Sequence, residues 1–190
     1  ETRPIVVGDS MIAALSDYPE IKHVQRYSTK PGMIKTINAF QGMVLKGIGP
    51  EYDRAFFRRH LLEGEFPQFS DSASSNQVVI SKSLADKMRL KLGDKIDTYY
   101  IQDDVRARRL KIVGIYQTNF SEYDNLFLLT DLCLVNRLNK WEPDQVSGVE
   151  LELRDYDKLE ETTYAIAADT NERSDRFGAE YCVPGWASWM

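Results

Sequence analysis

The order of predicted elements at the two ends of the chain constrains its fold most strongly. The first segment predicts a strand at about 5–7, a helix at 11–16 and a strand at 24–29. The last segment repeats this order, with a strand at 149–153, a helix at about 158–169 and a strand at 181–183. Two strand–helix–strand units can pair into one small α/β layer, and the residues between them then form an insertion.

Turn signals mark the rest of the first segment and the start of the insertion. Pro31-Gly32 predicts a turn, residues 33–45 predict one or two strands, and residues 47–50 predict a break. The apolar positions within 52–62 follow helical spacing, so we expect a short amphipathic helix there, ended by Gly64.

The rest of the insertion is richer in strands. We expect strands at 78–80, 95–101, 108–116 and 126–129, of which the second and third form a hairpin with a polar connection. Ser81 or Ser83 should cap a helix at 84–88, and Thr130 or Asp131 should cap a helix that ends near Leu138.

This organisation predicts an α+β fold of two interleaved parts. Residues 1–47 and 145–190 should form an outer subdomain, and residues 48–144 an inserted, β-rich one. The two ends carry opposite charge: six basic and four acidic residues in 1–47, against four and ten in 145–190. Opposite charge is compatible with the two ends packing together.

Composition excludes several classes of protein. The longest unbroken apolar runs are five residues, whereas a membrane span needs about 20. The chain opens on Glu1-Thr2-Arg3-Pro4 without a signal peptide, which predicts a piece of a longer protein. A net charge of −5 makes nucleic acid a poor partner.

A search for catalytic and metal sites yields little. His60 lies on the apolar side of the predicted helix, which favours a packed histidine over a general base, and His23 lies at the start of a strand. With two His and no CxxC, neither a zinc site nor any other cofactor is indicated. Cys133 and Cys182 are interpreted as two buried thiols, with a disulfide between them as the alternative.

Three stretches, taken in order, resemble a known family. They are Val78–Ile96 with the pattern VVISKSLADKM…LKLGDKI, Leu110–Leu132 with LKIVGIY…NLFLLTDL, and Val146–Leu151 with VSGVEL. The chain is similar to the extracytoplasmic (periplasmic core) domain of ABC transporter permeases of the lipoprotein-releasing and macrolide-exporter type, called FtsX-like or MacB-like. The similarity covers about residues 45–160 well and residues 1–45 more loosely.

The resemblance implies a function. The family's domain lies between two membrane helices on the periplasmic side of the bacterial inner membrane, and combines a porter-like subdomain with an inserted sabre-like one. It is not catalytic and acts by mechanotransmission, relaying ATP hydrolysis by a cytoplasmic ABC ATPase to lipoprotein release or substrate export. The partners implied are the permease's own transmembrane helices, the ATPase, a second permease subunit (a copy or a paralogue), and a lipoprotein or periplasmic carrier.

Two departures from the family pattern affect the expected contacts. The lipoprotein-releasing permease carries a long hook in its sabre hairpin, whereas the connection here is short. We nevertheless expect a partner at that tip, on Gln102, Asp103, Asp104, Val105 and Arg106. The tail from Pro184 to Met190 also differs from the expected lead into a second membrane helix.

Two other functions remain open from the sequence. One is a free-standing extracytoplasmic module that binds a small ligand or peptide, and the other is a hydrolase that uses His60. A gene with apolar segments of about 20 residues on both sides of this domain would favour the permease.

Overall fold

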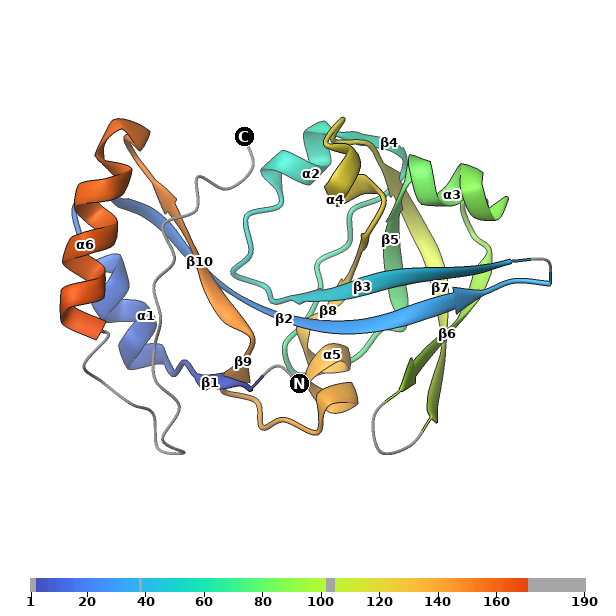
Figure 1. Cartoon of the computed structure of the whole chain (residues 1–190), viewed down its shortest axis with the longest axis horizontal. Coiled ribbons are helices and arrows are strands. Elements are labelled where there is room, and N and C mark those ends of the chain that lie inside the picture. The colour runs from blue at the N-terminus through green and yellow to red at the C-terminus, as the bar shows by residue number, and fades with distance from the viewer. Residues whose placement is uncertain (1–2, 38, 102–104, 171–190) are drawn as a thin grey trace. The chain divides into compact units, whose positions relative to one another are not determined.

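The chain folds into two compact units. The computed structural model describes residues 3–37, 39–101 and 105–170. One unit comprises Glu1–Arg26 and Asp144–Met190 and is here called the terminal unit; the other, Tyr27–Pro143, is the inserted unit. The fold is α+β, as the sequence predicts (Figure 1).

The first boundary between the units differs from the predicted one. It falls between Arg26 and Tyr27, inside strand β2 (Ile21–Lys35), whereas the sequence places it at 47–48. The reason is the pairing of the second half of β2 with all of β3 (Phe40–Ile48) inside the inserted unit. The identification of the two units as porter-like and sabre-like stays a prediction.

The terminal unit joins segments from both ends of the chain around one core. Its elements are β1 (Ile5–Val6), α1 (Asp9–Ser16), the first part of β2, β9 (Gln145–Val146), β10 (Gly148–Leu153), η1 (Tyr156–Lys158) and α6 (Leu159–Thr170). Strand β1 is antiparallel to β9, and β10 lies beside β2. Leu15 of α1, Val24 of β2, Leu153 of β10 and Ile166 of α6 are buried in the same cluster.

The inserted unit contains most of the strands. Its elements are the rest of β2, β3, α2 (Ala55–Arg59), β4 (Leu61–Gly64), β5 (Gln77–Ser81), α3 (Lys82–Met88), β6 (Lys95–Ile101), β7 (Val105–Tyr116), α4 (Ser121–Asp124), β8 (Phe127–Asp131) and α5 (Leu132–Asn139). Strand β4 lies at the edge of the sheet, beside the end of β7.

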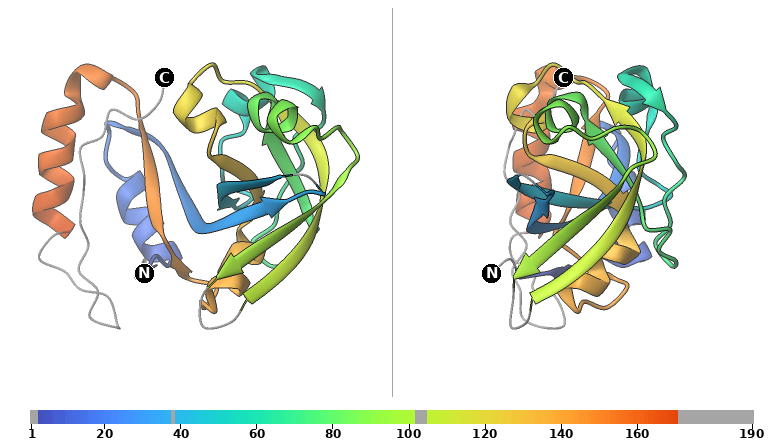
Figure 2. Two further views of the ribbon diagram at one scale, coloured as in Figure 1. Left: turned by 45° about the vertical axis from the view of Figure 1, so that its right-hand side comes forward. Right: turned by 90° about the vertical axis from the view of Figure 1, so that its right-hand side faces the viewer.

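Six strands of the inserted unit close into a ring. The order is β2-β3-β8-β5-β7, and β6 pairs with both β7 and β2. Figure 2 shows β6 and β7, the green to yellow strands, side by side at the surface. All six strands contribute buried side chains to one cluster, which therefore fills the ring together with residues of α3 and α5. A second, aromatic cluster, built around Tyr52, Phe57, Tyr116 and Tyr123, packs on the outside.

The predicted turn at Pro31-Gly32 is wrong, because both residues lie inside β2. Pro31 is opposite Val44 of β3, and pairing with β6 begins only at Met33, so the missing N–H of proline is tolerated. A Cβ atom on Gly32 would lie 2.7 Å from Cδ1 of Tyr100. The glycine is therefore needed because β2 and β6 approach each other closely at this position, and it does not mark a turn.

The predicted helix over 52–62 is only partly correct. Helix α2 covers Ala55–Arg59, and Leu61 already belongs to β4, where it is opposite Tyr116 of β7. Pairing with β7 ends the helix there, although the apolar spacing continues to Leu61.

The two predicted helix caps have different outcomes. Ser81 Oγ accepts a hydrogen bond from the backbone N–H of Leu84 at 3.1 Å and caps α3, as predicted. Asp131 precedes α5, but its side chain makes no capping hydrogen bond. Its carboxylate accepts instead from the backbone N–H groups of Ser70 and Ser75 at 2.9 and 2.8 Å and from the Ser75 hydroxyl at 2.7 Å.

Candidate functional site

The predicted partner site lies at the end of the β6–β7 hairpin. Strand β6 ends at Ile101 and β7 begins at Val105, and these two residues are opposite each other. Their side chains are 68% and 70% exposed. Gln102, Asp103 and Asp104, the predicted tip residues between them, lie outside the described residues.

Arg106, the last predicted contact residue, is held against the unit. It is half-buried opposite Tyr100, and its Nη1 donates to the carbonyl oxygen of Arg137 at 3.3 Å. A cation at the last carbonyl groups of a helix is favourable, so this contact fastens the hairpin to α5. Val105 and Arg106 therefore point to opposite faces of the hairpin, and only Val105 is presented outward.

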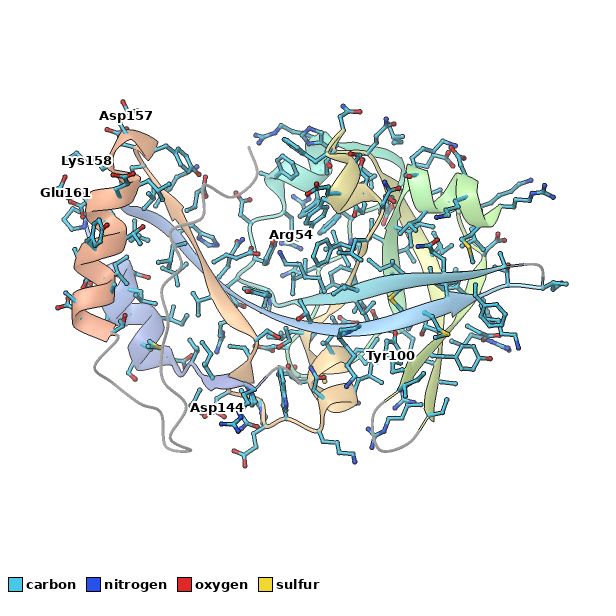
Figure 3. All side chains as sticks on the ribbon, in the orientation of Figure 1. Arg54, Tyr100, Asp144, Asp157, Lys158 and Glu161 are labelled. Atoms are coloured by element: carbon cyan, nitrogen blue, oxygen red, sulfur yellow. The ribbon has the colours of Figure 1, made fainter. Side chains whose placement is uncertain are left out.

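The inward face of the hairpin is buried and hydrogen-bonded. Tyr100, labelled in Figure 3, is 1% exposed, and its hydroxyl donates to Thr98 Oγ1 at 2.9 Å. Thr98 in turn donates to the carbonyl oxygen of Arg108 at 3.0 Å. Burial raises the pKa of Tyr100 to about 12, so the phenol is neutral at ordinary pH. Burial and hydrogen bonds on this inward face thus fix the conformation of the hairpin.

The outward face of the hairpin is apolar near its tip and charged farther from it. Asp97 accepts two hydrogen bonds from Arg109 across the strands, at 2.7 and 3.0 Å. These bonds lower the pKa of the Asp97 carboxyl and raise that of Arg109. On either side of this pair, Tyr99 lies opposite Ala107 and Lys95 lies opposite Lys111.

Two exposed apolar residues that the sequence does not single out lie where β2 turns into β3. Ile37 is fully exposed and Phe40 is 67% exposed. Lys35 Nζ lies 5.4 Å from the centre of the Phe40 ring, and Lys35 is itself opposite Asp97 of β6. Only the strand register reveals this proximity, because residues 33–45 and 95–111 are far apart in the chain.

The residues considered for catalysis have structural partners. The ring of His60 lies 4.4 Å from that of Phe56, and its Nδ1 is 2.8 Å from the Phe56 carbonyl oxygen. Within residues 3–37, 39–101 and 105–170 no group of three His, Cys, Asp or Glu side chains could hold a metal ion. Cys133 is buried in α5, whereas Cys182 lies outside the described residues, so their pairing stays a prediction.

The helices that the structure describes include none long and apolar enough to span a bilayer.

Comparison with known proteins identifies similar domains. A family model described as the MacB-like periplasmic core domain matches residues 3–169. The search of curated proteins found no match.

Two solved structures share the fold. One is the extracellular domain of the noncanonic ABC-type transporter YknZ from Gram-positive bacteria, with 15% identity and a TM-score of 0.58 over 87% of this chain and 84% of that one. The other is the periplasmic region of MacB from Actinobacillus actinomycetemcomitans, with 14% identity and a TM-score of 0.56 over 87% of this chain and 74% of that one.

Proposed function

This chain belongs to the family of MacB-like periplasmic core domains, and we propose that it is the non-catalytic part of an FtsX-like permease that relays cytoplasmic ATP hydrolysis to the periplasmic side. The terminal unit then corresponds to the porter-like subdomain and the inserted unit to the sabre-like one. The match over residues 3–169 is the observation that carries this proposal.

The geometry of the β6–β7 hairpin supports a relay. The hairpin is joined to the rest of the ring by the pairing of β6 with β2 and by the contact of Arg106 with α5, so a force on its tip is transmitted to the ring. The event on the periplasmic side is lipoprotein release or export of a small substrate, and the tip contacts the lipoprotein, its carrier or another periplasmic partner. A cytoplasmic ABC ATPase and a second permease subunit complete the transporter.

The test uses the full-length permease with its ATPase in membranes. Asp103→Ala, Asp104→Ala and Val105→Ser are combined in one variant. We expect it to keep the basal rate of ATP hydrolysis and to lose coupled lipoprotein release from spheroplasts, or coupled efflux of a macrolide. Leu62→Ser in β4, at a side chain that is 53% exposed, is the matched control. Coupled transport at the native rate in the triple variant would remove the tip from the mechanism.

The gene itself separates this proposal from a free-standing binding module. A permease requires apolar segments of about 20 residues before and after the domain. A gene that encodes only this domain behind a cleaved signal peptide would favour the module instead.

A further inference from the structure

The outside of the ring is covered unevenly. The aromatic cluster packs on the outward residues Ile48 of β3, Val79 of β5, Leu129 of β8 and Tyr116 of β7. The rest of the wall is formed by β6, the first half of β7, the end of β2 and the start of β3, and it carries the exposed side chains described above. We call the outward residues of this part of the wall the open face.

The register of the four strands places an apolar band on the open face. Gly42, Met33, Tyr99 and Ala107 follow one another across β3, β2, β6 and β7 in one row. Ile101 and Val105 lie two residues further along the hairpin, on the same face.

The neighbouring row adds one large exposed apolar side chain, that of Phe40, to this band. It runs from Phe40 through Lys35 and Asp97 to Arg109. Phe40, Ile101 and Val105 are each about two-thirds exposed. Met33 and Tyr99 lie between Phe40 and the pair at the hairpin tip. A continuous group of apolar side chains at the surface is typical of an interaction site.

Positive charge borders the apolar band. Lys35, Lys95, Arg109 and Lys111 are exposed, and the single acidic residue in these rows, Asp97, is bound to Arg109. The residues of these rows thus carry a positive net charge on a chain whose net charge is −5. Lys95 and Lys111 are directly opposite each other, and like charges in this position destabilise a strand pair. An anionic group bound between them would remove that repulsion.

We propose that the open face binds an amphipathic helix of a partner protein, with its apolar side on Phe40, Tyr99 and Val105 and its carboxylates at the lysines. A helix laid on a sheet is the general way to cover an apolar sheet face. The strands in these rows are already paired with one another, so recognition is through side chains and not by strand addition. The positive border favours an acidic partner over a second copy of the same face. This inference rests on the proposed role of the domain in contacting a partner.

The probe is a synthetic helical peptide of about 18 residues, five turns, with Leu at helical spacing and Glu on the flanks. A second peptide carries Lys in place of every Glu, and a third has the Glu peptide's composition in scrambled order. Binding to the whole chain is measured by calorimetry, and the contacted residues are mapped by amide chemical shifts. We expect the Glu peptide to bind at least about tenfold more tightly than either control, a difference of about 1.4 kcal/mol.

Two pairs of substitutions test the two halves of the proposal. Phe40→Ser with Val105→Ser removes apolar contact, and Lys95→Glu with Lys111→Glu reverses the border charge. Each pair should weaken binding of the Glu peptide by about tenfold or more. Leu62→Ser in β4 and Lys87→Glu, an exposed cation of α3, are the matched controls and should bind as the native chain does. Thermal unfolding of each variant shows whether its fold is retained.

Three results would overturn the proposal. They are equal affinity for the Glu and Lys peptides, shift changes outside the open face, and co-sedimentation with vesicles of phosphatidylcholine and phosphatidylglycerol in the absence of peptide binding. The last result would assign the open face to an anionic lipid surface. None of these measurements depends on transport, so a failure here is distinct from a failure of the proposed function.

Discussion

At the scale of single residues, closure of the ring depends on Gly32. A Cβ atom there would lie 2.7–2.8 Å from the ring of Tyr100 and 2.8 Å from the carbonyl oxygen of Tyr99, closer than such atoms pack. Because one of these neighbours is backbone, β6 itself would have to move away from β2.

The alanine variant at this position should therefore be unstable. We expect Gly32→Ala to lower the free energy of unfolding by about 1–3 kcal/mol, measured by urea denaturation. Gly42→Ala in β3 is the control, because no atom lies within 4 Å of a Cβ built there. Equal stability of the two variants would mean that the contact with Tyr100 is relieved without cost.

Because of Tyr100, the free energy of unfolding should change with pH in the alkaline range. Its pKa is raised to about 12 in the folded chain, against about 10 in an unfolded chain. The unfolded chain releases this proton first, so the stabilisation is complete below pH 10 and is lost as the pH rises toward 12.

The size of this effect can be measured by urea unfolding at pH 9 and pH 11. Tyr100 alone should remove about 1.4 kcal/mol of stability between these two values. Tyr100→Phe should show a correspondingly smaller loss. Tyr164→Phe, at a ring that is 76% exposed, is the control and should follow the native profile. Identical profiles for the native chain and Tyr100→Phe would contradict the assignment.

At the scale of elements, the sequence predicts those whose local signals agree with their tertiary contacts. The strand at 95–101 and the helix capped by Ser81 are correct, because alternation and capping chemistry are local properties. The turn at Pro31-Gly32 and the length of α2 are wrong, because a neighbouring strand decides the conformation there. That neighbour is distant in sequence, so no local pattern reports it.

The loop before β5 shows a further contact that local sequence does not reveal. The polar stretch from Ser70 to Asn76 is held at both ends by Asp131, which is 1% exposed and more than fifty residues away. A buried carboxylate with three hydrogen bonds to one loop fixes that loop in place.

Removal of this carboxylate should release the loop. We expect Asp131→Ala to cost about 3 kcal/mol of stability, since hydrogen bonds to charged groups are the stronger ones. Limited proteolysis should then cut the chain between residues 65 and 76. Asp71→Ala, an exposed acidic residue of the same loop, should leave both stability and cleavage unchanged. Cleavage of the native chain and Asp131→Ala at the same rate would show that the loop is held by other contacts.

At the scale of the whole molecule, order and spacing of motifs identify the family, while the interaction surface needs the structure. No single motif among residues 78–151 is specific, yet together they agree with the family match over 3–169. The open face includes Phe40 and Val105, which only the pairing of β2 with β6 places on one face. A pattern along the chain could indicate the hairpin but not the residues beside it.

The position of β8 in the ring has a consequence for how the chain is made. Strand β8 lies between β3 and β5, which are both synthesised before it. Each of these two strands therefore keeps one unpaired edge until β8 has been made. Such edges promote aggregation during folding. We expect pulse-labelled hydrogen exchange to show β8 and its partners protected last, and a chain ended at residue 126 to bind a holdase chaperone where the complete chain does not. Protection of β3 before β8 would contradict this order. The order in which the strands are synthesised, as much as the stability of the finished fold, then limits how much of this protein reaches its native state.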